Sequence, residues 1–477
     1  MLAEGEDDWL SMSREFLARV LTDIDGQPLT AFIAIPVPYA PLSTFLRAAP
    51  REKSVLWDPR GELAYATSGS VQTFDFQGPG RFVQAREAMA ALWPRIRVFA
   101  HADCEPPPPR VFGGFAFEPG FTGRAPWEEF SDGCFVLPRW QYARDASRQH
   151  SVLCLAADGE RDRGLTRRDQ LLSQSEDILT ALAAFAGEST HMRTAPPANV
   201  GLSESSLRQM PYEAWHAYVD LIREAIRRGK FGKIVAARHC EVVLDQPVDD
   251  VDVLTQLSAE PGCTRYAFRA ATSSFVGASP EVLVAKDGLE LTTQALAGTL
   301  RSLGSEMPML NARSLELMAS EKDRAEHDFV VREIRQSLRP LCDAIDVAER
   351  PSVSKIRSIL HLNTPIVARL HDDVTIWDLV AALHPTPAVG GSPKREAAAW
   401  IASHEPTPRG WYTGTVGWAD AAGDGRFVVA IRCGLISPRR ASIFTGAGIV
   451  AESDPSAEYA ETDLKQLPML RALGVLL

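Results

Sequence analysis

Two acidic segments that lie far apart in this 477-residue chain constrain its fold most strongly. The first, residues 318–328, has strong helix formers and neither Gly nor Pro, so it predicts a helix with Asp323 and Glu326 on one face. Two neighbouring carboxylates repel each other unless a cation lies between them. Lys322, four residues before Glu326, could serve in part, and a bound divalent metal would serve better.

The second acidic segment begins at residues 453–455, Ser-Asp-Pro, which is a typical helix start. It places Glu458, Glu461 and Lys465 on one helix face. If the two helices face each other, they offer four oxygen ligands, a set that suits Mg²⁺. An ordinary solvated helix face has the same spacing, so each segment alone leaves both interpretations open.

The composition is that of an ordinary soluble globular protein, with 45% hydrophobic and 23% charged residues. The net charge of −11 argues against a nucleic-acid partner, and it means that local cations must hold any anionic ligand. No run of 18 apolar residues occurs, so no membrane span is expected.

The cysteines are scattered, with neither a CxxC pair nor a zinc spacing. Thiols in a reducing compartment fit this pattern best, and the first 25 residues lack the pattern of a signal peptide, so a cytoplasmic location is expected. The seven cysteines are Cys104, Cys134, Cys154, Cys240, Cys263, Cys342 and Cys433.

The organisation of the chain changes at a polar segment rich in Pro, Ser and Thr. Residues 1–190 are rich in predicted strands and end in a helix over 165–186, whereas residues 191–206 read as a linker. Residues 207–477 then form the second region. Length alone would suggest two or three domains.

Several polar residues of the second region lie at the ends of predicted strands. A strand over 233–238 opens with Lys233, and a strand over 274–278 runs into Pro280, so Glu281 lies just past a strand end. Gly298 permits a close backbone approach to a ligand. The apolar run 427–433 predicts one strand that contains Arg432, and a buried arginine needs a carboxylate or phosphate partner.

Ten segments, in this order, resemble the chorismate-utilising enzymes, which include isochorismate synthase, anthranilate synthase component I, aminodeoxychorismate synthase component I and salicylate synthase. The N-terminal half resembles the family more loosely, through GGFAF at 113–117. The resemblance implies an α+β fold, a large chorismate-binding fold of packed antiparallel sheets with outer helices, to which both halves contribute. The ten segments are KIVAAR (233–238), ASPE (278–281), ALAGT (295–299), SEKDRAEH (320–327), HLNTPI (361–366), LHPTPAVGG (383–391), RGWYTGTVGW (409–418), IRC (431–433), GAGIV (446–450) and SDPSAEYAETDLK (453–465).

Within this family, Lys233 and the HPTP loop at 384–387 resemble the isochorismate synthases. Members that use amides lack this lysine, and aminodeoxychorismate synthases have a lysine in place of Ala297. Salicylate synthases share Lys233 and Glu281, so a salicylate synthase is the main alternative. An amine-using member and a non-catalytic chorismate-binding protein are the others.

The resemblance implies that the protein adds water at C2 of chorismate while the C4 hydroxyl leaves, which gives isochorismate. One face of the ring then needs a base and the other an acid, for which it implies Lys233 and Glu281. A lysine acts as a base only where burial or a nearby cation lowers its pKa. The apolar residues 282–284 that follow Glu281 offer the setting that raises the pKa of a carboxylic acid.

The resemblance also implies the ligand sets. Mg²⁺ would bind the ring carboxylate and be held directly by Glu326 and Glu461, and through waters by Asp323 and Glu458. The remaining residues would surround the substrate: Arg432, Tyr412 and the backbone near Gly446 at the enolpyruvyl carboxylate, Lys465 at a carboxylate, Gly298 and Thr299 beside the C4 hydroxyl, and His384 in an orienting role.

Chorismate is the expected partner, with no amidotransferase subunit and a monomeric chain as the family-like state. The sequence leaves open which pathway uses the product: menaquinone, or a siderophore built from salicylate or dihydroxybenzoate.

Overall fold

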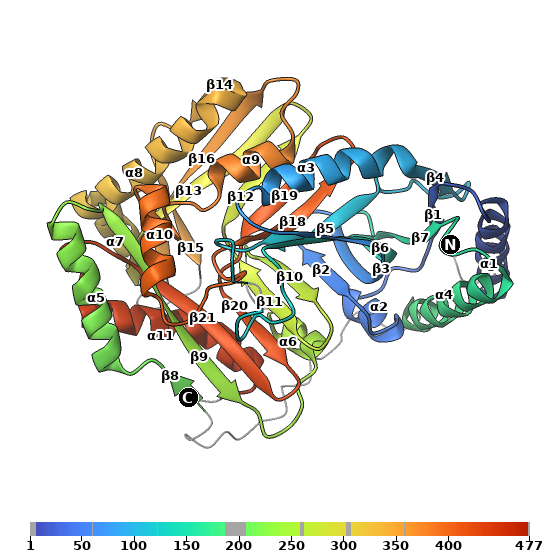
Figure 1. Ribbon diagram of the computed structural model, residues 1–477, viewed down its shortest axis with the longest axis horizontal. Coiled ribbons are helices and arrows are strands. Elements are labelled where there is room, and N and C mark those ends of the chain that lie inside the picture. Colours follow the sequence, from blue (N-terminus) through green and yellow to red (C-terminus); the bar gives the residue numbers. More distant parts are fainter. Residues whose placement is uncertain are drawn as a thin grey trace.

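The computed structural model describes residues 6–59, 61–121, 123–186, 207–257, 262–301, 307–356 and 359–475. The predicted linker, 191–206, lies outside these ranges. Figure 1 shows strands from the whole chain in the middle of the molecule and most helices on its outside. The helices are α1 (Glu6–Asp23), α2 (Leu42–Ala48), α3 (Arg81–Leu92), α4 (Leu165–Ala186), α5 (Tyr212–Arg227), α6 (Asp250–Gln256), α7 (Met307–Ala319), α8 (Glu321–Leu338), α9 (Ile376–Leu383), α10 (Lys394–His404) and α11 (Pro455–Ala472).

The described strands form one hydrogen-bonded sheet, in which neighbouring strands are antiparallel except where β1 pairs with β4. The strands are β1 (Thr30–Pro36), β2 (Ser54–Asp58), β3 (Ala64–Phe76), β4 (Ile96–Ala100), β5 (Arg110–Phe115), β6 (Gly133–Asp145), β7 (His150–Asp158), β8 (Leu207–Gln209), β9 (Lys233–Val243), β10 (Thr264–Arg269), β11 (Ser274–Ser279), β12 (Val282–Asp287), β13 (Glu290–Arg301), β14 (Cys342–Val347), β15 (Ser352–Ile356), β16 (Ile359–Leu370), β17 (Gly391–Ser392), β18 (Thr415–Asp420), β19 (Gly425–Val429), β20 (Cys433–Ser437) and β21 (Arg440–Ile449).

This sheet joins the two regions of the chain on either side of the predicted linker. Strand β2 pairs with β10, and β5 pairs with β18. Close packing at the second junction depends on Gly114, because a Cβ atom there would lie 2.5 Å from the carbonyl oxygen of Thr415 in β18. This glycine therefore permits a close backbone approach between the two regions. The mixed α+β fold class that the resemblance implies is confirmed.

The helices that carry the acidic segments pack against strands of the second region. Helix α8 contacts β13, and α11 contacts β21. Helix α11 begins after Asp454, whose side chain accepts a hydrogen bond from Ser456 N, so its predicted start is correct.

The first acidic segment is not one continuous helix. Helix α7 ends at Ala319, and α8 begins at Glu321 with Ser320 as its N-cap. The Ser320 side chain accepts a hydrogen bond from Asp323 N, as a capping serine does, so the prediction of an unbroken helix over 318–328 is wrong at this residue.

One other segment differs from its predicted conformation. The apolar run 427–433 is not one strand, because β19 ends at Val429 and β20 begins at Cys433. Between them Arg432 has φ of +54°, a left-handed conformation that interrupts a strand. The HLNTPI segment, residues 361–366, lies inside β16, where Pro365 is opposite Gln294 of β13.

All seven cysteines are buried and free of disulfides. Within the described residues, no helix is both long enough and apolar enough to span a membrane.

Candidate active site

Strands β9, β13 and β21 and helices α8 and α11 surround a cavity of about 120 Å³. Its wall is completed by the segments around residues 280–281, 388–389, 412–413 and 431–432. Most of the site residues that the sequence predicts line this cavity, although they come from segments far apart in the chain. They are Lys233, Glu281, Gly298, Glu326, Tyr412, Arg432, Gly446, Glu461 and Lys465.

Lys233 and Glu326 form an ion pair inside the cavity. Lys233 begins β9 and is 9% exposed, and its Nζ donates to Glu326 Oε1 of α8 at 2.6 Å. Gly448 on the neighbouring strand makes room for the lysine, because a Cβ atom there would lie 2.6 Å from Lys233 Cε. The glycine of the GAGIV segment thus shapes the position of this amine.

Glu461 and Lys465 form a second pair on α11. Lys465 Nζ lies 2.6 Å from Glu461 Oε1 and donates to Gly446 O at 2.9 Å. Burial would raise the pKa of Glu461, but the charge and hydrogen bond of Lys465 outweigh burial and hold this pKa below its ordinary value. Glu461 is therefore ionised at neutral pH.

Glu281 is the most strongly perturbed carboxyl group of the cavity. It is 5% exposed, and burial raises its pKa from 4.5 to about 7, against the opposing charge of Lys233. Its Oε1 accepts a hydrogen bond from Thr386 Oγ1 at 3.5 Å, and its backbone carbonyl accepts from Val429 N at 3.0 Å. The side chain is thus suited to donate a proton near neutral pH.

Arg432 supplies a buried cation to the same cavity, and its left-handed backbone is strained. Such a conformation costs about 1–3 kcal/mol in a non-glycine residue and is often retained at functional sites. Tyr412 lines the wall beside it and stacks on Phe444, with ring centres 5.5 Å apart. His361 also lines the cavity, and burial together with the charges of Arg432 and Lys465 lowers its pKa to about 3, so its imidazole is neutral.

Asp323 and Glu458 do not line the cavity but lie in the first turns of α8 and α11. Asp323 accepts a hydrogen bond from Ser320 Oγ at 2.5 Å, and Glu458 accepts from Ser453 Oγ at 2.9 Å. Asp323 nevertheless packs against the cavity-lining Gly298, since a Cβ atom on this glycine would lie 3.2 Å from Asp323 Cβ.

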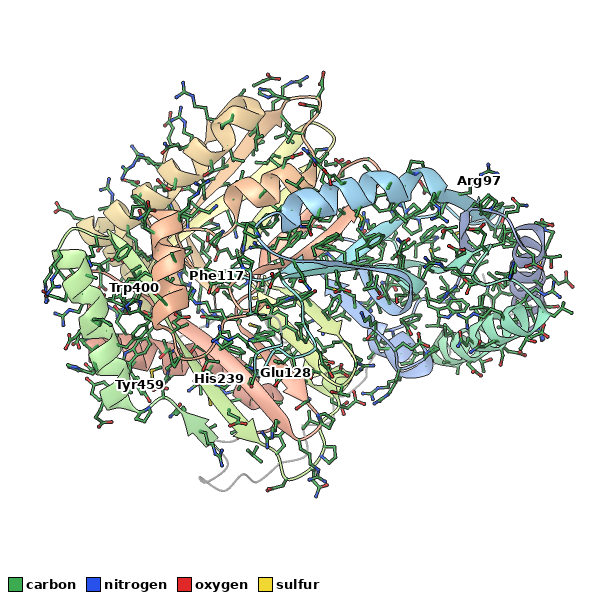
Figure 2. All side chains as sticks on the ribbon, in the orientation of Figure 1. Arg97, Phe117, Glu128, His239, Trp400 and Tyr459 are labelled. Carbon is green, nitrogen blue, oxygen red and sulfur yellow. The ribbon has the colours of Figure 1, made fainter. Side chains whose placement is uncertain are left out.

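His384 also lies outside the cavity wall. His384 Nε2 lies 3.1 Å from the carbonyl oxygens of both Ala116 and Phe117, and it anchors the 384–391 loop to the end of the GGFAF segment. Figure 2 labels Phe117 near the centre of the molecule. Thr299 follows the bulge at Gly298 in β13 and is opposite His361 in β16, and its side chain is outside the described residues.

Sequence reasoning gave no role to Arg409, whose guanidinium holds three parts of the cavity wall together. It is 3% exposed, pairs with Glu405 at 2.6 Å, and donates to Val235 O at 2.7 Å and Val389 O at 2.8 Å. It also donates to Thr413 Oγ1 at 3.3 Å. Its place in the RGWYTG segment was visible in the sequence, but its contacts depend on chain reversals that local patterns do not predict.

We expect Arg409→Gln to lower the free energy of unfolding by about 3 kcal/mol, because it leaves the carboxylate of Glu405 buried without its cation. Denaturant unfolding measures this loss. The control is Arg426→Gln, which breaks the more exposed pair with Glu62 and should cost less than about 1 kcal/mol. Equal losses in the two variants would contradict a supporting role for Arg409.

Glu326 and Glu461 have suitable chemistry for a magnesium site. They line one cavity from two helices, and each contacts a lysine ammonium, so cations already lie beside both carboxylates. Across the described parts of the chain, no three His, Cys, Asp or Glu side chains come together as a metal cage. Mg²⁺ commonly takes one or two protein carboxylates and completes its shell with substrate and water, so the donor set fits.

Comparison with known proteins gives consistent matches along the chain. The model of a family described as chorismate binding enzyme matches residues 16–474. The salicylate biosynthesis isochorismate synthase of Pseudomonas aeruginosa is 35% identical over 452 residues, which cover 92% of this chain and 89% of that protein. Isochorismate synthase MenF of Bacillus subtilis is 34% identical over 77% of this chain and 75% of its own.

Solved structures give the same picture. The structure of MenF, the menaquinone-specific isochorismate synthase from Escherichia coli, matches with a TM-score of 0.79 and 26% identity, over 98% of this chain and all of the other. Anthranilate synthase component I from Streptococcus pneumoniae matches with a TM-score of 0.66 and 20% identity, over 90% of this chain and 97% of the other, and this match concerns the fold alone.

Proposed function

Because this chain belongs to the family of chorismate-binding enzymes, we infer that it is an isochorismate synthase, an isomerase that converts chorismate to isochorismate. One observation of the structure supports this function above all. A lysine, a protonatable buried glutamate and two further carboxylates line the same cavity, although they come from β9, the segment before β12, α8 and α11.

Lys233 is the proposed base and Glu281 the proposed acid. Lys233 acts in its neutral form, so the ammonium that is paired with Glu326 first gives up its proton to solvent. The neutral amine then takes a proton from water as the oxygen bonds to C2, the ring double bond shifts, and the C4–O bond breaks. Glu281 gives its proton to the departing hydroxyl, which leaves as water. Atoms and charge balance, because one water enters and one leaves, Lys233 gains the proton that the entering water loses, and Glu281 supplies the proton that the departing hydroxyl takes up.

Cations that line the cavity would hold the two carboxylates of chorismate. Arg432 and the hydroxyl of Tyr412 are proposed to bind the enolpyruvyl carboxylate, and Lys465 lies within reach of a carboxylate near Gly446. Glu326 and Glu461 are proposed to hold Mg²⁺, with Asp323 and Glu458 behind them. When bound, the ion would neutralise and orient the ring carboxylate.

Product analysis tests the function. Incubating the protein with chorismate and Mg²⁺ should give an equilibrium mixture of chorismate and isochorismate, separable by chromatography. Accumulation of fluorescent salicylate would overturn this assignment in favour of a salicylate synthase, and an amino-substituted product with ammonium would favour an amine-using member. Unchanged chorismate would favour a non-catalytic binding protein.

We expect the turnover rate to fall about tenfold per pH unit above about pH 7, because Glu281 donates only while it is protonated. Stability should follow the same group. Between about pH 4.5 and 7 the folded state binds more protons than the unfolded state, so the free energy of unfolding decreases as the pH rises. Unfolding of Glu281→Gln at several pH values should lack this decrease, and a wild-type-like decrease in the variant would contradict the assignment.

The proposal extends to a monomeric cytoplasmic enzyme that needs no ammonia-supplying subunit. The buried thiols of the cysteines suit a reducing compartment. The names of the relatives include both menaquinone and salicylate biosynthesis, and the pathway that uses the product stays open.

A further inference from the structure

The buried carboxyl group of Glu281 has one side-chain hydrogen-bond partner within the described part of the chain. The hydroxyl of Thr386 donates to its Oε1 at 3.5 Å, whereas its Oε2 has no such partner among the described residues. Thr386 is 7% exposed and does not line the catalytic cavity, the cavity that is lined by Lys233 and Glu281. The threonine therefore reaches the carboxyl group from within the protein and leaves Oε2 available to a substrate.

The main chain of Glu281 is fixed by separate contacts. Its carbonyl oxygen accepts from Val429 N at 3.0 Å, and its N–H donates to Ser279 Oγ at 3.2 Å. Ser279 Oγ in turn donates to Val429 O at 2.6 Å. Because these bonds hold the backbone, the orientation of the carboxyl group depends on rotation about the side-chain bonds, and among the described residues only Thr386 forms a hydrogen bond that restricts this rotation.

Thr386 lies in the 384–391 loop, which follows α9 (Figure 1) and is anchored at both ends. At one end the ring of His384 binds two backbone carbonyl groups, and at the other Val235 N donates to Gly390 O at 2.9 Å. Within the loop, the carbonyl oxygen of Thr386 accepts from Gly390 N at 3.0 Å. The loop thus holds the threonine hydroxyl at a fixed place against the proposed acid.

We propose that Thr386 is a positioning residue for the acid: by donating to Oε1 of Glu281, its hydroxyl leaves the carboxyl proton on Oε2, from which the departing C4 hydroxyl of the substrate takes it. This inference rests on the proposed function. As the Oε2–H bond breaks, the proton passes to the departing hydroxyl and the side chain becomes a carboxylate, so the hydrogen bond from Thr386 strengthens because its acceptor gains charge. Such contacts are often long in an unliganded site and shorten in the transition state, which fits the 3.5 Å distance.

The protonation of Glu281 distinguishes this role from simple packing. Burial raises the pKa of Glu281 to about 7, and both the charge of Lys233 and the hydrogen bond from Thr386 oppose this rise. Loss of the hydroxyl should therefore raise this pKa further, whereas looser packing would admit water and lower it. The other titratable or charged groups that line the cavity are Glu326, His361, Arg432, Glu461 and Lys465.

The test compares Thr386→Val, which keeps the shape of the side chain but removes the hydroxyl, with Thr386→Ser, which keeps the hydroxyl. In the valine variant, kcat for chorismate should fall about tenfold, a typical loss for a hydrogen bond to a charged group, while KM changes less than about twofold because the threonine does not touch substrate. The decline of turnover above about pH 7 should begin about one pH unit higher, the shift that corresponds to this tenfold loss. The serine variant should keep the wild-type pH profile.

The matched control is Thr67→Val. Thr67 is also a buried threonine, and its hydroxyl accepts from Val55 N at 2.9 Å, but it lies in β3 and outside the catalytic cavity. This control should lose stability and keep the wild-type pH profile. A wild-type kcat and pH profile in Thr386→Val, a shift of its profile to lower pH, failure of serine to restore the profile, or an equal shift in Thr67→Val would each overturn the proposal.

Unfolding at several pH values tests the contact without turnover. In the wild type, the free energy of unfolding should decrease between about pH 4.5 and 7; in Thr386→Val the decrease should continue to about pH 8, and with Glu281→Gln added it should disappear. If the wild type does not convert chorismate, the proposed function fails, and this measurement alone decides whether Thr386 acts on the carboxyl group. A decrease that ends at the same pH in the wild type and in Thr386→Val overturns the proposal. Thermal unfolding checks that each variant is folded, and Thr386→Ala replaces the valine variant if that one is not.

Discussion

Replacing Lys233 with alanine is expected to lower kcat by about 10³-fold while the dissociation constant for chorismate changes little, because a positioned general base contributes about 10²–10⁴-fold. The amine lines the catalytic cavity together with Glu281, and the carboxylate that it contacts, Glu326, is the proposed metal ligand. Single-turnover kinetics measures the chemical step, and quenching of intrinsic fluorescence by chorismate measures binding.

The matched control for this variant is Lys286→Ala. Lys286 is also a buried strand lysine, paired with Asp424 at 2.6 Å, but it lies outside the catalytic cavity. Its loss should lower the unfolding free energy and leave kcat within about threefold of wild type, as expected for a change remote from the reacting atoms. Persistent turnover in Lys233→Ala would show that another group acts as the base.

Glu326→Ala is expected to abolish the Mg²⁺ dependence of the protein together with most of its activity. Removal of one of two proposed ligands leaves only Glu461 to hold the ion, and loss of a metal-binding carboxylate weakens such a site by about 10²-fold or more. The variant also frees Lys233 from its 2.6 Å ion pair. The Mg²⁺-dependent rise in melting temperature provides a measurement that does not rely on turnover.

Glu333→Gln is a suitable control for the metal prediction, because this carboxylate lies on the same helix but does not line the cavity. It should keep the wild-type Mg²⁺ titration. If Glu326→Ala also keeps that titration, the first acidic helix has no part in the metal site.

The sequence predicted well which residues gather around the cavity, because they lie in short segments with strong local signals. Lys233 at the start of a strand and Glu281 after Pro280 both occupy the predicted positions, and both line the cavity. The spacing of Asp323 and Glu326 placed them on one helix, but spacing alone could not show that only Glu326 reaches the cavity wall. That difference depends on the capping contact between Ser320 and Asp323.

Features that depend on tertiary packing were beyond local patterns. The left-handed backbone of Arg432 breaks an apolar run that reads as a single strand. In the sequence, Arg409 reads only as an arginine in a polar turn. Its contacts with β9 and with the 384–391 loop form only in the folded chain.

The single sheet that the strands form has a consequence for how the protein folds. Lys233 and Glu326 are 93 residues apart in the chain, and the wall between them forms only after β9 has paired with β21 and β13 with β16. Chain segments this distant lose much conformational freedom before their contacts can compensate, which makes such topologies slow to fold. Recovery of activity during refolding should therefore lag behind recovery of the helical circular dichroism signal. The time at which activity returns would report when the last long-range strand pairing forms.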